Sequence, residues 1–211
     1  MIDFPQTAAF GKKIPLVQLK NQGMPNRLLA QIKSLVWAYK LSPSTVQLAA
    51  TEAVKEIEVM DLTVKPACSS VRALAAVISA LDKLIPNPLI FRVYDEDGSP
   101  REVTFNLKAS GGALFGDSEV YRLFRTEDDV ALPAGVGNLE SFYQQLAASV
   151  GGITAIPTES ICDLAGRHYR IESLRANLAE VERKLERESQ FARKYELAKE
   201  KQRLQRELAD V

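Results

Sequence analysis

The last part of the chain limits most strongly what this sequence can fold into. After Gly166 the chain runs to its end without a glycine or a proline, and it is rich in residues that favour helices. Apolar residues recur there at steps of three and four, as in the seam of a coiled coil, at Ile171, Leu174, Leu178, Val181 and Leu185. A helix of about forty residues would be about 60 Å long. Part of it must therefore contact something other than the core of a chain of 211 residues.

The sequence leaves open what this helix contacts. The seam breaks near Glu188, and apolar residues continue beyond it on a rotated face. The favoured interpretation is self-association through the seam as a homodimer. The alternatives are docking to a different protein, and a kinked helix or hairpin that folds back along the sheet of its own chain.

Residues 1–165 carry alternating helix and strand signals. Apolar residues repeat at helical spacing through residues 71–85, behind Ser69 and Ser70, either of which can cap the helix. Residues 89–94 and 101–108 alternate as strands around an Asp-Gly turn, which predicts a hairpin, and a further helix begins after Asn138. These elements favour an α+β body with mainly antiparallel sheets and flanking helices. We expect this body at residues 1–165 and a helical, coiled-coil segment at 166–211.

The body also contains a weak internal similarity. Residues 24–64 and 70–125 share an order of one helix followed by three strands. Either a duplication or the common design of antiparallel sheets explains this order.

The composition excludes several kinds of site. His168 is the single histidine, and Cys68 and Cys162 are the two cysteines, which excludes multi-histidine zinc sites and four-cysteine structural sites. We therefore expect no bound metal and no cofactor. No apolar run approaches the roughly twenty residues that cross a bilayer, and the first residues lack a secretory signal. The expected location is cytoplasmic, with reduced thiols and no membrane partner.

The predicted hairpin suggests one catalytic alternative. Nucleases of the restriction-endonuclease type place carboxylates and a lysine on neighbouring strands to hold Mg²⁺ and activate water. Asp95, Glu102 and Lys108 are the candidates here, but Asn106 stands where an acid should precede the lysine. Turn chemistry also accounts for Asp95. A degenerate or unusual metal-dependent nuclease is therefore the alternative, and the favoured interpretation assigns no catalytic residue.

The first forty residues are strongly basic, with Asp3 as their only acidic residue. Such a surface either binds phosphate or is simply solvated. The candidates for contacts to nucleic-acid phosphates are Lys12, Lys13, Lys20, Arg27 and Lys40.

Several strings together resemble a known bacterial family of unassigned function. They are FPQTAAFGKKIP, VWAYKLSPSTVQL, EIEVMDL, LDKLIPNPLIF and SQFARKYELAKEKQRLQREL, and the similarity covers nearly the whole chain. Genes of that family tend to lie beside genes for Swi2/Snf2-type helicases and DNA methyltransferases, in restriction-like or phage-defence loci. The resemblance implies a DNA-processing context and carries no catalytic residue.

These observations predict a non-enzymatic accessory or assembly protein of a bacterial DNA-processing system. It would bind a protein partner, a helicase or methyltransferase, and DNA binding is an open second function. The alternatives are the metal-dependent nuclease described above and a purely structural homodimer.

Overall fold

A computed structural model describes residues 1–115, 123–156 and 158–211. Within these ranges, short 3-10 turns cover Gln6–Ala8 and Pro66–Cys68. The strands are β1 (Ala9–Ile14), β2 (Ile32–Leu41), β3 (Ile57–Val64), β4 (Leu89–Tyr94), β5 (Pro100–Asn106) and β6 (Leu123–Thr126). The helices are α1 (Leu16–Asn21), α2 (Asn26–Leu29), α3 (Pro43–Val46), α4 (Val71–Leu84), α5 (Leu139–Val150), α6 (Ile161–Arg187) and α7 (Phe191–Ala209).

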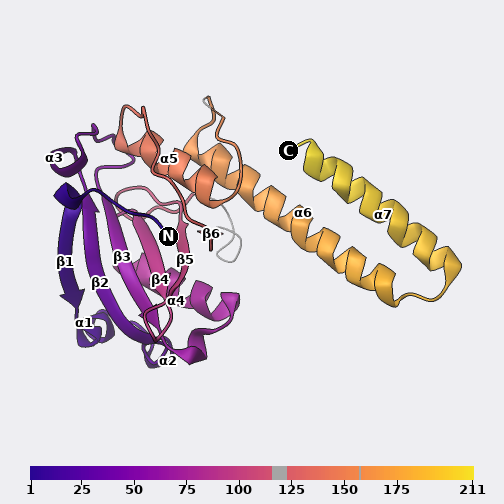
Figure 1. Cartoon of the computed structure of the whole chain (residues 1–211), viewed down its shortest axis with the longest axis horizontal. Helices are drawn as coiled ribbons and strands as arrows, with labels where there is room; N and C mark the ends of the chain where they lie inside the picture. Colours follow the sequence, from indigo (N-terminus) through magenta and orange to yellow (C-terminus); the bar gives the residue numbers. More distant parts are fainter. Residues whose placement is uncertain (116–122, 157) are drawn as a thin grey trace.

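The strands form a single sheet in sequential order, from β1 at one edge to β6 at the other (Figure 1). Every neighbouring pair is antiparallel except β3 and β4, which are parallel. A parallel pair needs a crossover connection, and α4 provides it. The α+β class with a mainly antiparallel sheet and flanking helices is confirmed.

Both faces of the sheet are buried. On one face α1, α2 and α4 pack against the strands through residues such as Leu28 and Ile78. On the other face α5 and the first turns of α6 contribute Tyr143 and Leu164. Burial on both faces explains why β3 is apolar along most of its length instead of alternating cleanly.

Two predicted helix starts are confirmed by their capping bonds. The Ser70 side chain accepts a hydrogen bond from the backbone N–H of Ala73, 3.1 Å away. Asn138 accepts one from the backbone N–H of Ser141 at 2.8 Å. The predicted β4–β5 hairpin is also present, with Gly98 at φ 89° in its turn, a conformation that favours glycine.

The region before α4 differs from the helix and three strands that the sequence suggested for residues 24–64. It contains α2, β2, α3 and β3, because the short strand expected at residues 45–49 is not formed and Pro43–Val46 is a helical turn. Ser42 and Thr45 form a reciprocal capping box there, and this local hydrogen bonding outweighs the strand propensity of the segment. In residues 70–125 the order α4, β4, β5, β6 agrees with the prediction, although the start of the last expected strand lies outside the described residues.

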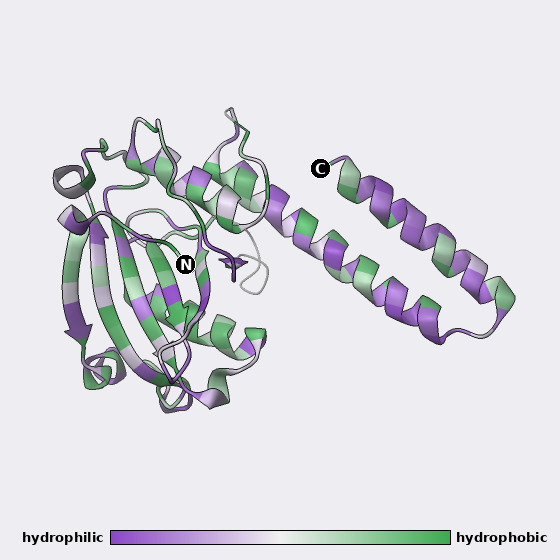
Figure 2. Cartoon of the chain, in the orientation of Figure 1, coloured by the Kyte–Doolittle hydropathy of each residue, from purple (hydrophilic) through white to green (hydrophobic). Residues whose placement is uncertain are grey.

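The C-terminal segment is a helical hairpin that projects from the body (Figure 1). The chain leaves the helix at Glu188, which is extended, and the Glu188 carboxylate accepts hydrogen bonds from the N–H groups of Ser189 and Gln190, each at 2.9 Å. The expected helix of about forty residues is therefore divided into α6 and α7 near the predicted break in the seam. Figure 2 shows that hydrophilic residues predominate along this hairpin, with hydrophobic residues interspersed among them.

The apolar seam of α6 is covered by α7 of the same chain. Ile171 and Leu174 are buried, Leu178, Val181 and Leu185 are half-buried, and Leu204 on α7 is buried. An ion pair of 2.8 Å between Lys201 and Glu182 also joins the two helices. The segment thus folds back on its own first helix and not on the sheet. The sequence-based prediction of self-association through the seam therefore competes with cover of the seam by α7, and the mass of the full chain in solution decides between them.

The body and the hairpin share one helix. Because α6 begins at Ile161, its first turns, with Leu164 and Ala165, belong to the core of the body. Within the described ranges no helix is long and apolar enough to cross a membrane.

Candidate functional site

The structure does not bring the three residues of the predicted nuclease site together. Asp95 lies on the β4–β5 turn, 3.8 Å from Arg101. Glu102 is buried and pairs with Arg125 at 3.0 Å. Lys108 follows the far end of β5, roughly 20 Å along the strand from Glu102 at the usual rise per residue.

Lys108 instead closes the end of α4. Its Nζ donates hydrogen bonds to the main-chain oxygens of Ile85 at 2.7 Å and Asp82 at 3.1 Å. The Asp82 carboxylate also accepts a hydrogen bond from Asn106. Burial lowers the pKa of Lys108, and the charge of Asp82 opposes that shift. Lys108 therefore acts within the core as a helix cap.

The five basic residues lie on the β1–β2 side of the molecule. Lys12 and Lys13 are on the edge strand β1, Lys20 is on α1, Arg27 is on α2, and Lys40 is near the end of β2. The first four are exposed, and none of them forms an ion pair with another part of the chain that the structure describes. Lys40 is half-buried and has an acidic partner.

Two aromatic rings lie among these lysines. The rings of Phe10 and Trp37 have centroids 4.3 Å apart, and Nζ of Lys40 lies 5.9 Å from the centre of the Trp37 ring. Lys12 stands directly opposite Trp37 on the neighbouring strand, so their side chains share one face of the sheet. Phe10, Lys12, Trp37 and Lys40 are called the aromatic–basic strip below.

A pair of carboxylates lies at one end of this strip. Lys40 pairs with Glu56 Oε2 at 2.6 Å. The Asn87 amide donates to Glu56 Oε1 at 2.6 Å and to Glu58 Oε1 at 3.0 Å. We call Lys40, Glu56, Glu58 and Asn87 the acidic cluster.

The topology of the sheet assembles the acidic cluster. The end of β2 is antiparallel to the start of β3, so Lys40 is paired with Glu58 in the register. The backbone N–H of Glu58 donates to Pro88 O at 2.8 Å, which fixes the turn before β4 against β3. Asn87 therefore lies beside both glutamates.

Burial makes Glu58 the unusual member of the cluster. Glu58 is 1% exposed, and its carboxyl group is hydrogen-bonded to the Asn87 amide and to the Glu56 carboxyl group. Burial, followed by the nearby charge of Glu56, raises the pKa of Glu58 to about 7, although Asn87 and Lys40 oppose the shift. Glu58 therefore changes protonation near neutral pH.

The pKa of Glu56 is shifted in the opposite direction. Burial tends to raise its pKa, but the hydrogen bond and the charge of Lys40 outweigh burial, and the pKa of Glu56 is lowered. With side chains 28% and 34% exposed, Glu56 and Lys40 form the open rim of the cluster above the buried Glu58.

Sequence reasoning missed the acidic cluster. Glu56 and Glu58 alternate in EIEVMDL, and that spacing places both side chains on the same face of a strand. The missing information was the pairing of β3 with β2 and β4, because only this pairing brings Lys40 and Asn87 to the two glutamates. A search for two acids at alternate positions at a strand start would have found the pair.

Fold and site together define an α+β protein with one six-stranded sheet, a projecting helical hairpin, and an aromatic–basic strip that ends at two carboxylates. The chain belongs to the family described as domain of unknown function DUF4391, which it matches over residues 2–208. No curated protein and no solved structure shows a significant match to the chain.

Proposed function

We propose that this protein binds nucleic acid through the aromatic–basic strip. It would act as an accessory or assembly protein of a bacterial DNA-processing system with a helicase and a DNA methyltransferase, of the restriction-like or phage-defence kind. The observation that carries the proposal is the pair of contacting rings, Phe10 and Trp37, placed between Lys12 and Lys40 on one face of the sheet.

The strip combines the two contacts that a single strand of nucleic acid needs. Aromatic rings stack on bases of any sequence, and lysines beside them neutralise the phosphates. Phe10 is available for such stacking because its side chain is 48% exposed. The exposed Lys13, next to Lys12 on β1, and Lys20 and Arg27 on α1 and α2 add further positive charge to this part of the chain.

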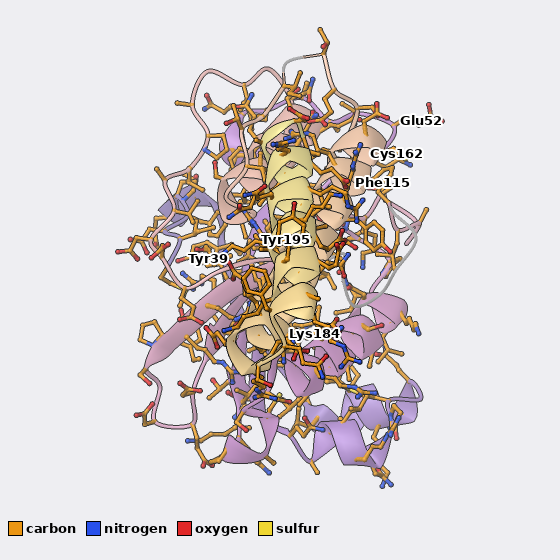
Figure 3. All side chains as sticks on the ribbon, turned by 90° about the vertical axis from the view of Figure 1, so that its right-hand side faces the viewer. Tyr39, Glu52, Phe115, Cys162, Lys184 and Tyr195 are labelled. Carbon is orange, nitrogen blue, oxygen red and sulfur yellow. The ribbon has the colours of Figure 1, made fainter. Side chains whose placement is uncertain are left out.

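The helical hairpin supports the assembly part of the proposal. Phe191 and Tyr195 lie one turn apart on α7 and are 86% and 63% exposed. Figure 3 looks at the molecule from the hairpin side and shows α7 in front of the body, with Tyr195 labelled on it. Exposed aromatic residues are the common anchors of protein interfaces. The proposed partner of this surface is the helicase or the methyltransferase.

Nucleic-acid binding is tested by fluorescence anisotropy with labelled single-stranded and double-stranded oligonucleotides, in EDTA and at several salt concentrations. The expected result is an affinity that falls steeply with salt, because bound phosphates release counterions. Phe10→Ala should weaken single-strand binding by about 1–3 kcal/mol through lost stacking. Lys12→Glu should weaken binding and lower the salt slope.

The matched control is Lys199→Glu, which makes the same charge change at an exposed position of α7. It should leave the affinity unchanged. Equal losses in Lys12→Glu and Lys199→Glu, or no loss in Lys12→Glu and Phe10→Ala, would show that the strip is not the binding surface.

The assembly role is tested by purification of the tagged full chain from its native host, followed by identification of the bound proteins. Recovery of a helicase or methyltransferase with the wild type, and its loss with Phe191→Ser and Tyr195→Ser together, is the expected result. A partner that binds the wild type and the double variant equally well would place the interface elsewhere on the chain.

A further inference from the structure

Lys40 differs from Lys12, the other lysine of the aromatic–basic strip. Nζ of Lys40 lies 2.6 Å from Glu56 Oε2, whereas Lys12 is exposed and forms no ion pair within the described residues. An ammonium group donates the same kind of charge-assisted hydrogen bond to a carboxylate as to a phosphate. The Glu56 carboxylate therefore lies where a phosphate bound to Lys40 would lie.

Glu56 is held in this position by groups other than Lys40. The Asn87 amide donates to Glu56 Oε1 at 2.6 Å, and the Glu56 carboxyl group is hydrogen-bonded to that of Glu58. An isolated surface ion pair contributes little, partly because two long side chains must be ordered to form it. Here Asn87 and Glu58 already order one of the two partners, so the pair is a built feature of the folded chain.

We propose that Glu56 is an internal competitor of nucleic acid, a carboxylate that occupies Lys40 and must be displaced before this lysine can bind a phosphate. This inference rests on the proposed function, because it concerns the same strip. Phosphate has access to the pair, since the side chains of Lys40 and Glu56 are 34% and 28% exposed. The competition takes place beside the stacking surface, because Lys40 Nζ is 5.9 Å from the centre of the Trp37 ring.

Removal of the Glu56 charge should strengthen binding and change its salt dependence. A lysine that Glu56 has already neutralised releases no counterions when a strand binds, whereas a freed Lys40 neutralises one more phosphate. Each phosphate contact to a single strand changes the slope of log K against log[salt] by about 0.7. The slope should therefore become more negative by about this amount.

The test compares Glu58→Gln with the double variant Glu56→Gln and Glu58→Gln. Both proteins carry Glu58→Gln because Glu58, which is paired with Lys40 in the strand register, would otherwise replace Glu56 as its partner. Binding of a short oligothymidylate is followed in EDTA through the fluorescence of Trp37, the single tryptophan of the chain. The double variant should bind about 3–10-fold more tightly at low salt, a gain that a damaged fold would not produce.

Two further changes in these proteins show whether Glu56 acts through Lys40. Lys40→Met should weaken binding by about threefold more in the double variant, where Lys40 contacts phosphate, than in Glu58→Gln, where Glu56 holds it. Glu52→Gln, the same charge change at an exposed residue of the loop before β3, is the control. It should change the affinity of Glu58→Gln by less than about twofold, because salt screens a more distant charge.

The pairing of Lys40 is also measured without nucleic acid. The hydrogen bond that Lys40 donates to Glu56, together with the charge of Glu56, outweighs burial and raises the pKa of Lys40. Acetic anhydride reacts with the neutral amine, so Lys40 should be acetylated faster in the double variant than in Glu58→Gln, relative to the exposed Lys199. An unchanged rate would overturn the proposal, because Glu56 would then not hold the lysine in solution.

The outcomes separate this inference from the proposed function. If Glu58→Gln binds the oligonucleotide and Lys12→Glu weakens that binding, the proposed function stands. The competition is then overturned if Glu56→Gln gives no gain, or if Lys40→Met costs the same affinity with and without Glu56. Absence of binding in both Glu58→Gln and the double variant would overturn the proposed function, and this inference with it.

Discussion

Lys108 lies 3.4 Å from the Asp82 carboxylate, and neither side chain is more than 1% exposed. The same ammonium group binds main-chain oxygens at the end of α4. A lysine that looked like a catalytic residue on a hairpin is thus a buried structural cation.

Replacing this lysine should be strongly destabilising. Lys108→Met leaves the Asp82 charge buried without its cation, and removal of one partner of such a pair usually costs about 3–5 kcal/mol. Urea unfolding followed by circular dichroism measures the loss. Lys108→Met combined with Asp82→Asn should recover part of it, because the remaining amide is neutral and still accepts from Asn106. A single variant as stable as the wild type would return Lys108 to the list of catalytic candidates.

Replacement by alanine should change the stability of the protein in opposite directions at two glycines, Gly151 and Gly166. A Cβ at Gly151 would lie 2.9 Å from the His168 ring and 3.0 Å from the Phe124 ring. These rings contact each other, with centroids 4.0 Å apart, and His168 is buried. Gly151→Ala should therefore destabilise by about 1–3 kcal/mol through overpacking.

Gly166 lies inside α6, and a Cβ there meets no atom within 4 Å. Gly166→Ala should therefore stabilise the protein by roughly 0.8–1 kcal/mol, because alanine is the better helix former. Thermal unfolding of both variants checks the pair. A stabilising Gly151→Ala would mean that His168 does not pack as described.

The sequence was informative where local signals and packing agree. Ser70 and Asn138 are capping residues in front of regular apolar repeats, and both helices begin where predicted. The strand β1 was missed because its burial pattern is exposed almost throughout. Its identity comes from pairing with β2, which no local pattern reveals.

The candidate site was harder to predict for a related reason. Glu102 on β5 and Lys108 just beyond its end are polar residues in an alternating pattern, and such a pattern normally places polar residues towards water. Here they are buried because Arg125 and Asp82 neutralise them, and both partners are distant in sequence. Glu58 is buried beside Asn87 and Glu56 instead of an oppositely charged ion-pair partner, so its role also depends on the neighbours that the sheet supplies.

Glu58 should also make stability depend on pH. Its folded pKa of about 7 lies above the ordinary 4.5, so the folded state binds more protons between these values. Stability from this group is fully present below about pH 4.5 and is lost as the pH rises to about 7. Glu58→Gln should remove this loss, which makes it more stable than the wild type above pH 7 by about 3 kcal/mol in EDTA.

Subtracting the stability curve of Glu58→Gln from that of the wild type separates the contribution of Glu58 from that of His168. Titration of His168 changes the stability in the opposite direction. Burial lowers the pKa of His168 to about 4, so its contribution is lost as the pH falls from about 6.5 towards 4. Urea unfolding at several pH values gives both curves. Parallel curves for wild type and Glu58→Gln between pH 5 and pH 8 would contradict the shifted pKa.

The cover of α6 by α7 predicts how truncation of the chain changes its oligomeric state. Removing residues 189–211 deletes α7 and uncovers the half-buried Leu178, Val181 and Leu185 on α6. An uncovered seam of this spacing associates with a second helix. The truncated chain should therefore dimerise, whereas the full chain should have the mass of one molecule, 23.3 kDa, in light scattering at low micromolar concentration.

Leu178→Glu in the truncated chain should restore the single-chain mass, because a buried charge at the centre of the seam opposes pairing. If the full chain is already a dimer and Leu178→Glu makes it a monomer, then α6 contacts another molecule and α7 does not fully cover the seam. In that case the structural homodimer, rather than the self-contained hairpin, describes the protein in solution.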